Sequence, residues 1–294
     1  MKRGILFLVV LLGFFACKQG EKQSKSKGAV AETIEVPRPE VKLYAFDGGT
    51  VVVNTLEIFA QDETYKGQSK EFADAFYVVE HPKGNLIWDA GLPETLVGLP
   101  EPFTTPDGAF TVSRKDSVAD QLKKIGLSPS DFKYISLSHT HFDHSGTANN
   151  FKEATWLVQE TEYDFVTSKE VKENNPDVYN AIKELTNIKK LNGDFDVFGD
   201  GTVVLKYMPG HTPGHQVLYL DLEDHGPLLL AGDLYHFNEN RTSKRIPIFN
   251  HDIGQTRASM DAFEAFVEEK NAKVYLQHSK EDFNRLPKAP NYLK

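Results

Sequence analysis

The stretch of sequence that decides the fold of this chain reads LSHTHFDHSG and runs from residue 137 to residue 146. It places the imidazoles of His139, His141 and His144 and the carboxylate of Asp143 within six consecutive positions, directly after an apolar run. Imidazole nitrogen and carboxylate oxygen are zinc ligands, and a loop that follows a buried strand lets several of them point to one place. A single histidine here would suit a polar surface turn, but the set predicts a metal site.

Four more candidate ligands lie downstream: His211 and His215 in a PGHTPGH segment, Asp233 in an AGD segment and His278 in a YLQH segment. All but His211 stand at the start or end of an apolar, strand-like run. A metal site assembled from several loops on a rigid sheet needs such a scattered set. Cys17 is the only cysteine, which excludes both a disulfide within the chain and a site built from several cysteines.

Short apolar runs predict many strands, and three stretches have helical spacing. The strand runs are residues 75–79, 86–88, 134–137, 156–158, 203–207, 217–220, 228–231 and 274–276, and the helical stretches are 118–125, 161–166 and 256–269. In the last helix Met260, Phe263, Phe266 and Val267 share one face, which we assign to the core. Residues 41–53 alternate around Gly48 and Gly49, which predicts a hairpin. Strands with helices between them imply two sheets covered by outer helices, an α/β layered fold.

The N-terminal residues 1–17 have the features of an export signal: two basic residues, an apolar run from 5 to 12, then Ala16 and Cys17. The run is shorter than the roughly 20 residues that span a bilayer. Cys17 resembles the lipobox cysteine of bacterial lipoproteins, which is lipidated, and simple secretion is the alternative. Residues 18–40 are rich in Lys, Gln, Ser, Glu and Pro and predict a flexible linker. We therefore expect a folded domain over 41–294, either in a periplasmic or outer-membrane-associated lipoprotein or in a secreted protein.

The charge balance argues against a nucleic-acid partner. The chain carries 33 basic and 42 acidic side chains and a net charge of −9, which would repel a phosphate backbone. Basic residues are dispersed along the predicted domain and form no obvious basic face. A small-molecule substrate is the better expectation.

Taken together, the HxHxDH segment at 139–144, the PGHTPGH segment, Asp233 and His278 resemble the metallo-β-lactamase superfamily, and they occur in its order. Trp88-Asp89-Ala90-Gly91 resembles the early D-x-G turn of that family. The resemblance extends from Val41 to the C-terminus and implies an αββα sandwich, two mixed β-sheets flanked by helices.

Position by position, the resemblance implies a dinuclear zinc centre. Its implied ligands are His139, His141 and His215 for one zinc and Asp143, His144 and His278 for the other, with Asp233 bridging them. His211 would only orient its loop, and Asp89 would fix a ligand. Two divalent ions can hold a hydroxide, lower its pKa to roughly 7 and polarise the carbonyl that it attacks.

Within the superfamily, the chain most resembles the N-acyl-homoserine lactone lactonases, which open a lactone ring and quench quorum signals. The bridging Asp233 disfavours most true β-lactamases, and seven intact ligands disfavour a mononuclear iron enzyme. A thioesterase of the glyoxalase II type is the alternative, although only 16 residues follow His278, where that enzyme carries an extension. A non-catalytic surface lipoprotein on the same fold is the other class, and metal analysis of the purified protein would separate it from an enzyme.

The resemblance also implies catalytic roles, for Asp143 and for a hydrogen-bond donor close to Asp233. The lactonases commonly carry a tyrosine three residues after the bridging aspartate, but here His236 stands at that position and Tyr235 precedes it. Either residue could stabilise the oxyanion. The loops at 96–110 and at Phe237 or 246–249 are expected to contact the acyl chain. The sequence leaves open the acyl-chain preference, the native metal and the oligomeric state.

Overall fold

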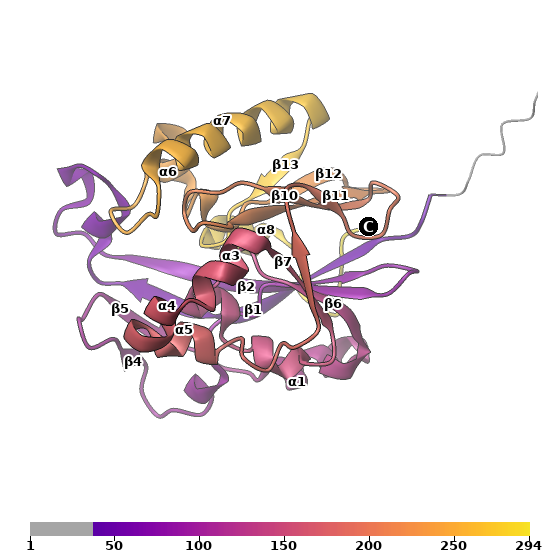
Figure 1. The fold of residues 1–294 in the computed structure, drawn as a ribbon, viewed down its shortest axis with the longest axis horizontal. Helices are drawn as coiled ribbons and strands as arrows, with labels where there is room; N and C mark the ends of the chain where they lie inside the picture. Colours follow the sequence, from indigo (N-terminus) through magenta and orange to yellow (C-terminus); the bar gives the residue numbers. More distant parts are fainter. Residues whose placement is uncertain (1–37) are drawn as a thin grey trace, which may run out of the picture. The chain divides into compact units, whose positions relative to one another are not determined.

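Two β-sheets of eight and five strands are built from residues far apart in the chain (Figure 1). The structure is a computed structural model and describes residues 38–294, of which Pro39–Lys294 form one compact unit. The strand order is β4-β5-β1-β2-β3-β6-β7-β8 in the larger sheet and β13-β12-β11-β10-β9 in the smaller one. The expectations for an export signal and for most of the linker fall outside the described residues.

The larger sheet is mixed, because β3, β6, β7 and β8 run parallel while β1 is antiparallel to both β2 and β5. Its strands are β1 Lys42–Val53, β2 Lys70–Glu80, β3 Asn85–Trp88, β4 Phe103–Thr104, β5 Phe110–Ser113, β6 Phe132–Ser136, β7 Thr155–Gln159 and β8 Ile188–Leu191. The strands of the smaller sheet are β9 Phe195–Asp196, β10 Val203–Tyr207, β11 Gln216–Leu222, β12 Gly226–Leu230 and β13 Lys273–Tyr275.

Helices cover the outer face of each sheet. The α-helices are α1 Val118–Leu122, α2 Phe142–Ser145, α3 Glu160–Val166, α4 Lys169–Asn174, α5 Pro176–Asn180, α6 Asn238–Ser243, α7 Ile253–Lys270 and α8 Lys280–Arg285. The predicted helix at 256–269 lies within α7, which crosses the smaller sheet in Figure 1. Its Met260 and Phe263 are fully buried and pack against Val217 and Leu229 of the sheet, as the apolar face predicts.

Three apolar layers hold the sandwich together. Between the sheets, Leu43, Tyr77 and Trp88 of the larger sheet share one cluster with Leu205 and Leu220 of the smaller sheet. A second cluster joins the other face of the larger sheet to α1, α3 and α4, and a third joins the smaller sheet to α7. Burial of apolar area on this scale is the main force that stabilises such a fold. The predicted αββα sandwich is confirmed.

One local prediction is wrong: residues 41–53 do not form a hairpin. β1 is a continuous strand of 12 residues that pairs with β2 along its whole length, and Gly48 is the extra residue of a bulge between Asp47 and Gly49. A Cβ atom at Gly48 would lie 3.0 Å from Cα of Gly91. Two adjacent glycines therefore let the strand bend past the 88–91 turn instead of reversing the chain.

No helix in the part of the chain that the structure describes is both long enough and apolar enough to cross a membrane. Residues 92–110 contain a short 3-10 turn at Glu94–Leu96, the two-residue strand β4 and, at Phe110, the first residue of β5.

Candidate metal centre and substrate cavity

The candidate site forms where the parallel strands β3 and β6 end side by side. Their carboxyl ends lie at the same edge of the sheet, so that Asp89 and the loop from Leu137 meet there. The carboxylate of Asp89 accepts hydrogen bonds from the backbone N–H of Ser138 at 2.6 Å and from Nδ1 of His144 at 3.0 Å. Asp89 has a φ of 56°, an unusual conformation for a residue with a Cβ atom, and these bonds hold it there. Asp89 thus orients His144, the kind of contact expected for it.

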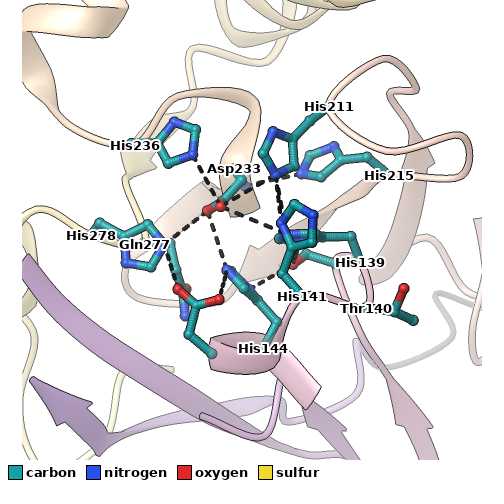
Figure 2. Close-up of polar contacts among 12 residues, drawn as sticks. His139, Thr140, His141, His144, His211, His215, Asp233, His236, Gln277 and His278 are labelled. Carbon is teal, nitrogen blue, oxygen red and sulfur yellow. Dashed lines mark hydrogen bonds and ion pairs between the residues drawn. The ribbon is translucent and has the colours of Figure 1, made fainter. Parts of the chain in front are cut away.

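A first group of ligand atoms comes from His139, His141, His211 and Asp233, all within 4.8 Å of one another (Figure 2). The distance from Nε2 of His139 to Nδ1 of His141 is 2.8 Å, and Nε2 of His211 lies 3.2 Å and 3.1 Å from these two atoms. A neutral imidazole carries one proton, so three ring nitrogens cannot all be satisfied by bonding to one another. A cation at their centre would satisfy all three.

A second group consists of Asp143, His144 and His278. Asp143 and His144 lie in α2, the short helix that begins after His141, and His278 follows β13 in the other sheet. Nδ1 of His278 donates to the carbonyl oxygen of Ala73 at 3.0 Å, which leaves Nε2 directed toward Asp143 at 3.7 Å. The backbone bond fixes the ring orientation and the tautomer, as in known metal-binding histidines.

The carboxylate of Asp233 lies between the two groups, with one oxygen toward each (Figure 2). Its Oδ1 is 3.0 Å from Nε2 of His278 and 3.3 Å from Nε2 of His144. Its Oδ2 is 3.5 Å from Nε2 of His211 and 3.7 Å from Nε2 of His139. This is the position expected for a bridging ligand.

The structure exchanges the expected roles of His211 and His215. His215 is fully buried, its Nδ1 donates to the carbonyl of Met208 at 3.0 Å, and its Nε2 accepts the backbone N–H of Asp233 at 3.0 Å. Both ring nitrogens are therefore occupied by the protein, and none is left for a metal. Burial lowers the pKa of His215 to about 4, so the ring stays neutral and can accept that bond. We assign the ligand position to His211 and the orienting role to His215.

The arrangement of buried donors fits a divalent metal site. Nε2 of His144 and Oδ1 of Asp233 are buried and lie 3.3 Å apart, yet neither atom makes a hydrogen bond of good geometry with a described residue. Burial opposes charge on Asp233, yet His236, His278 and His144 together hold the pKa of that carboxyl well below its usual value. Burial also lowers the pKa of His139 and His211, which keeps these rings neutral and able to bind a metal. Nitrogen and carboxylate donors of this kind suit zinc.

His236 and Tyr235 point in opposite directions. Nε2 of His236 lies 3.1 Å from Oδ2 of Asp233 (Figure 2). The ring of His236 packs edge-on against that of Phe59, with ring centroids 4.8 Å apart. Tyr235 is fully buried in the apolar layer under α7, with its ring centroid 5.9 Å from that of Phe263. The prediction that Tyr235 could act on substrate is wrong, because consecutive side chains of an extended segment face opposite sides.

A cavity of about 380 Å³ opens onto the two ligand groups. Its lining residues are Val51, Ile58, Phe59, Phe72, Asp107, Ala109, Phe110, His141, Phe142, Asp143, Asp233, His236, Ile248, Phe249 and His278. The expected loops contribute Ala109, Phe110, Ile248 and Phe249, whereas Phe237 lies buried in the apolar core beside the cavity. Its walls are apolar and its base carries the ligand atoms, as in many small-molecule sites.

Several residues that line the cavity were not predicted from the sequence. Ile58 and Phe59 lie in a 3-10 turn at Leu56–Phe59, a short apolar run that could have been noticed. Phe72 lies in β2 and shows no feature that distinguishes it from a core residue. Phe142 stands inside the HxHxDH segment, and its place between two ligands was the available signal.

Glu162 is a further buried residue that the sequence did not reveal. Its Oε1 accepts hydrogen bonds from the backbone N–H and the hydroxyl of Thr140, at 2.9 and 2.7 Å, and its Oε2 accepts from the backbone N–H of Gly214 at 2.9 Å. A Cβ atom at Gly214 would lie 2.4 Å from Cβ of Glu162, so glycine is required there. Glu162 thus joins the loop of His139 and His141 to the loop of His211.

Comparison with known proteins places the chain in one family. Residues 72–278 match the model of the metallo-beta-lactamase superfamily. The chain is 28% identical over 267 residues to N-acyl homoserine lactonase AttM of Rhizobium radiobacter. The match covers 86% of this chain and 98% of the relative. The chain is also 30% identical over 223 residues to an N-acyl homoserine lactonase of Bacillus thuringiensis. That match covers 74% of this chain and 85% of the relative.

A solved structure is similar throughout the domain. An N-acyl homoserine lactone hydrolase with the product N-hexanoyl-L-homoserine bound at its catalytic metal centre superposes with a TM-score of 0.74. It is 28% identical in sequence, and the match covers 85% of this chain and 98% of the other. The complete domain of these enzymes is therefore present here. The chain belongs to the metallo-β-lactamase superfamily, among the relatives of its N-acyl homoserine lactonases.

Proposed function

We propose that this protein is a dinuclear zinc hydrolase that opens the lactone ring of N-acyl-homoserine lactones and thereby quenches quorum signals. The observation that carries the proposal is an apolar cavity that ends on two adjoining groups of ligand atoms with a shared carboxylate, Asp233. The relatives named above support the same substrate class. When bound, two zinc ions would supply an activated hydroxide and polarise the lactone carbonyl.

The side chains of this chain hold and orient the reacting groups. Asp143 lies in the cavity wall beside His278, where its carboxylate would hold the second metal and would pass the proton of the attacking hydroxide to the departing ring oxygen. His236 lies on the other side of Asp233, where its N–H can donate to the oxyanion that forms during attack. Asp89, His215 and Glu162 fix the ligand loops behind these residues.

The cavity lining favours an acylated lactone over a glutathione thioester. Phe59, Phe110 and Phe249 offer apolar surface for an alkyl chain, and no lysine or arginine lines the cavity in the described part of the chain. A glutathione moiety carries two carboxylates, which require basic partners when they are taken out of water. The acidic side chain of Asp107, which also lines the cavity, would instead repel them.

A substrate panel tests the proposed function. Purified protein loaded with zinc should hydrolyse N-acyl-homoserine lactones with a higher kcat/KM than a β-lactam, a glutathione thioester or a phosphodiester. Ring opening of the lactone releases a proton, and the rate of this proton release is measured. Metal-free protein is the control. Faster turnover of the thioester would favour a glyoxalase II-type enzyme, and no turnover of any substrate by metal-loaded protein would favour a non-catalytic lipoprotein.

His236 provides a test of oxyanion stabilisation. His236→Phe should lower kcat for the lactone by roughly 10 to 1,000-fold and leave the metal content unchanged, because it removes one donor that bonds most strongly in the transition state. Tyr235→Phe is the matched control and should change kcat little, since Tyr235 lies in the core. Equal kcat values for wild type and His236→Phe would mean that the metal ions stabilise the oxyanion unaided.

We further propose that the protein is exported and anchored to a membrane through lipidated Cys17, in the periplasm or at the outer membrane. Cys17→Ser should move the protein from the membrane fraction to the soluble fraction or leave it unprocessed, because each buried CH₂ of an acyl chain contributes about 0.8 kcal/mol. Fractionation and immunoblotting measure this, and kcat should not change. A wild-type protein that is already free in the medium would point to simple secretion.

A further inference from the structure

The exposed apolar side chains of this domain are concentrated around the mouth of the substrate cavity. Among the described residues, nine large hydrophobic side chains are exposed. Seven of them belong to two segments near that mouth, 99–103 and 248–253, and to the helices α2 and α3. These seven are Leu99, Phe103, Phe142, Phe165, Ile248, Phe249 and Ile253, with Ile248 the most exposed at 60%. We call them the apolar rim. Single exposed apolar residues need no explanation, but a group of seven does.

Shared contacts show that the rim is continuous. Phe142, Ile248 and Phe249 line the substrate cavity, and Phe142 also lines a neighbouring cleft of about 640 Å³ together with Leu99 and Phe103. On the other side, the ring of Phe165 lies 6.4 Å from that of His251, within the segment that joins Phe249 to Ile253. The rim thus borders both openings.

The two remaining exposed hydrophobic residues lie at the opposite edge of the sandwich. Ile188 begins β8, which runs parallel to β7 and β6, so it lies at the amino ends of the strands whose carboxyl ends carry the site. Tyr292 packs on Tyr44 with ring centroids 5.2 Å apart, beside the start of β1. The start of β1 pairs with the end of β2, next to the amino end of β3. Among the described residues, one edge of the domain therefore carries the seven exposed hydrophobic residues of the apolar rim, and the opposite edge carries only Ile188 and Tyr292.

We propose that the apolar rim rests on the surface of a phospholipid bilayer, with the cavity mouth turned toward the lipid. The position of Cys17, the predicted lipid anchor, would keep the domain close to a membrane. Between Cys17 and Pro39, where the folded unit begins, lie 21 residues. A segment of this length spans at most about 75 Å when extended. A tether of that reach lets the domain turn any side to the membrane, so the surface of the domain decides its orientation.

The side-chain chemistry fits the interfacial region of a bilayer. Phe103, Phe142 and Phe249 are aromatic, and amphipathic surfaces that bind membranes carry such residues on their apolar side. Arg257 is exposed one turn after Ile253 in α7, where its guanidinium can reach a lipid phosphate. The net charge of −9 disfavours a strongly anionic membrane, so we commit to a zwitterionic phosphatidylcholine surface. An acylated substrate dissolved in the lipid would then enter the cavity directly.

Site-specific fluorescence tests the orientation, and the chain suits it because Cys17 is its only cysteine. In the full chain carrying Cys17→Ser, the variants Ile253→Cys and Ile188→Cys are each labelled with an environment-sensitive fluorophore and mixed with phosphatidylcholine vesicles. Both variants share the same N-terminal segment, so any attachment through it affects them alike. Ile253 and Ile188 both lie outside the substrate cavity. Their exposed fractions are similar, 41% for Ile253 and 37% for Ile188.

The emission of the label at position 253 should shift to shorter wavelength when vesicles are added, and the emission at position 188 should stay unchanged. Equal shifts at both positions, or no shift at either, would overturn the proposal. A shift at position 253 that grows with protein concentration without vesicles would overturn it as well, because the rim would then bind a second copy of this chain. No substrate is present, so the outcome is independent of the proposed lactonase activity.

Discussion

Replacing Asp233 by alanine should abolish lactone hydrolysis and remove most of the bound metal. Its two carboxylate oxygens face different ligand groups, 3.0 Å from Nε2 of His278 and 3.5 Å from Nε2 of His211. No other described side chain lies between the two groups in this way. Without the carboxylate, five imidazoles must share two cations with one negative ligand, Asp143, which leaves the charge of the metals poorly balanced. A kcat at background level is the expected result.

Metal content per chain, measured on protein dialysed against a weak chelator, distinguishes the loss of metal from the loss of fold. Thermal unfolding of the metal-free protein should show that Asp233→Ala still folds. Asp224→Ala is a suitable control, because Asp224 is an exposed acid in the turn between β11 and β12, far from the site along both strands. Two tightly held metal ions and substantial activity in Asp233→Ala would show that Asp233 is not the bridge.

Replacing His211 by alanine should have the second largest effect, with loss of the first metal and of activity. Nε2 of His211 completes the group with His139 and His141, and its replacement leaves only two imidazoles and the shared carboxylate on that side. Three protein ligands are the fewest that hold catalytic zinc in most sites, and the bridge must also serve the second ion. We expect the metal content to fall toward one ion per chain.

His215→Ala is the matched comparison, because it lies in the same PGHTPGH loop but binds backbone groups of Met208 and Asp233. Loss of such an orienting partner typically weakens metal affinity by about 10 to 100-fold, so saturating zinc should restore much of the activity. Zinc titration monitored by calorimetry separates the two variants. If His211→Ala were rescued by zinc and His215→Ala were not, the ligand roles would be those that the sequence alone suggested.

The sequence predicts the chemistry of the site because ligand identity is local information. Three histidines and an aspartate within six residues could be recognised without any coordinates, and so could Asp233 and His278 at the ends of apolar runs. The layered fold follows from the same pattern, since apolar runs of strand length and one amphipathic helix must bury their faces against each other. Phe263 and Met260 are buried as that pattern requires.

The direction of a side chain at the end of a strand depends on what packs against the next residue. From the sequence, either Tyr235 or His236 could be the oxyanion donor. In the structure, Tyr235 packs into the apolar layer under α7, and His236 lies beside Asp233. Gly48 and Gly49 were equally ambiguous, because two glycines suit a hairpin and a bulge alike. Pairing with β2 on one side and β5 on the other made them a bulge.

What the sequence by itself determined is the set of metal-binding residue types, their order and the sandwich that carries them. Only the tertiary structure decided that His211 faces the metal site and His215 does not, that His236 lines the cavity, and that Ile58 and Phe72 form its wall. The physical reason is that these choices depend on partners far away in the chain. Nε2 of His215 accepts the N–H of Asp233, 18 residues further on, and the carbonyl oxygen of Ile58 accepts a hydrogen bond from the backbone N–H of Ile248. Such contacts exist only once strands and loops that are far apart in the chain lie side by side.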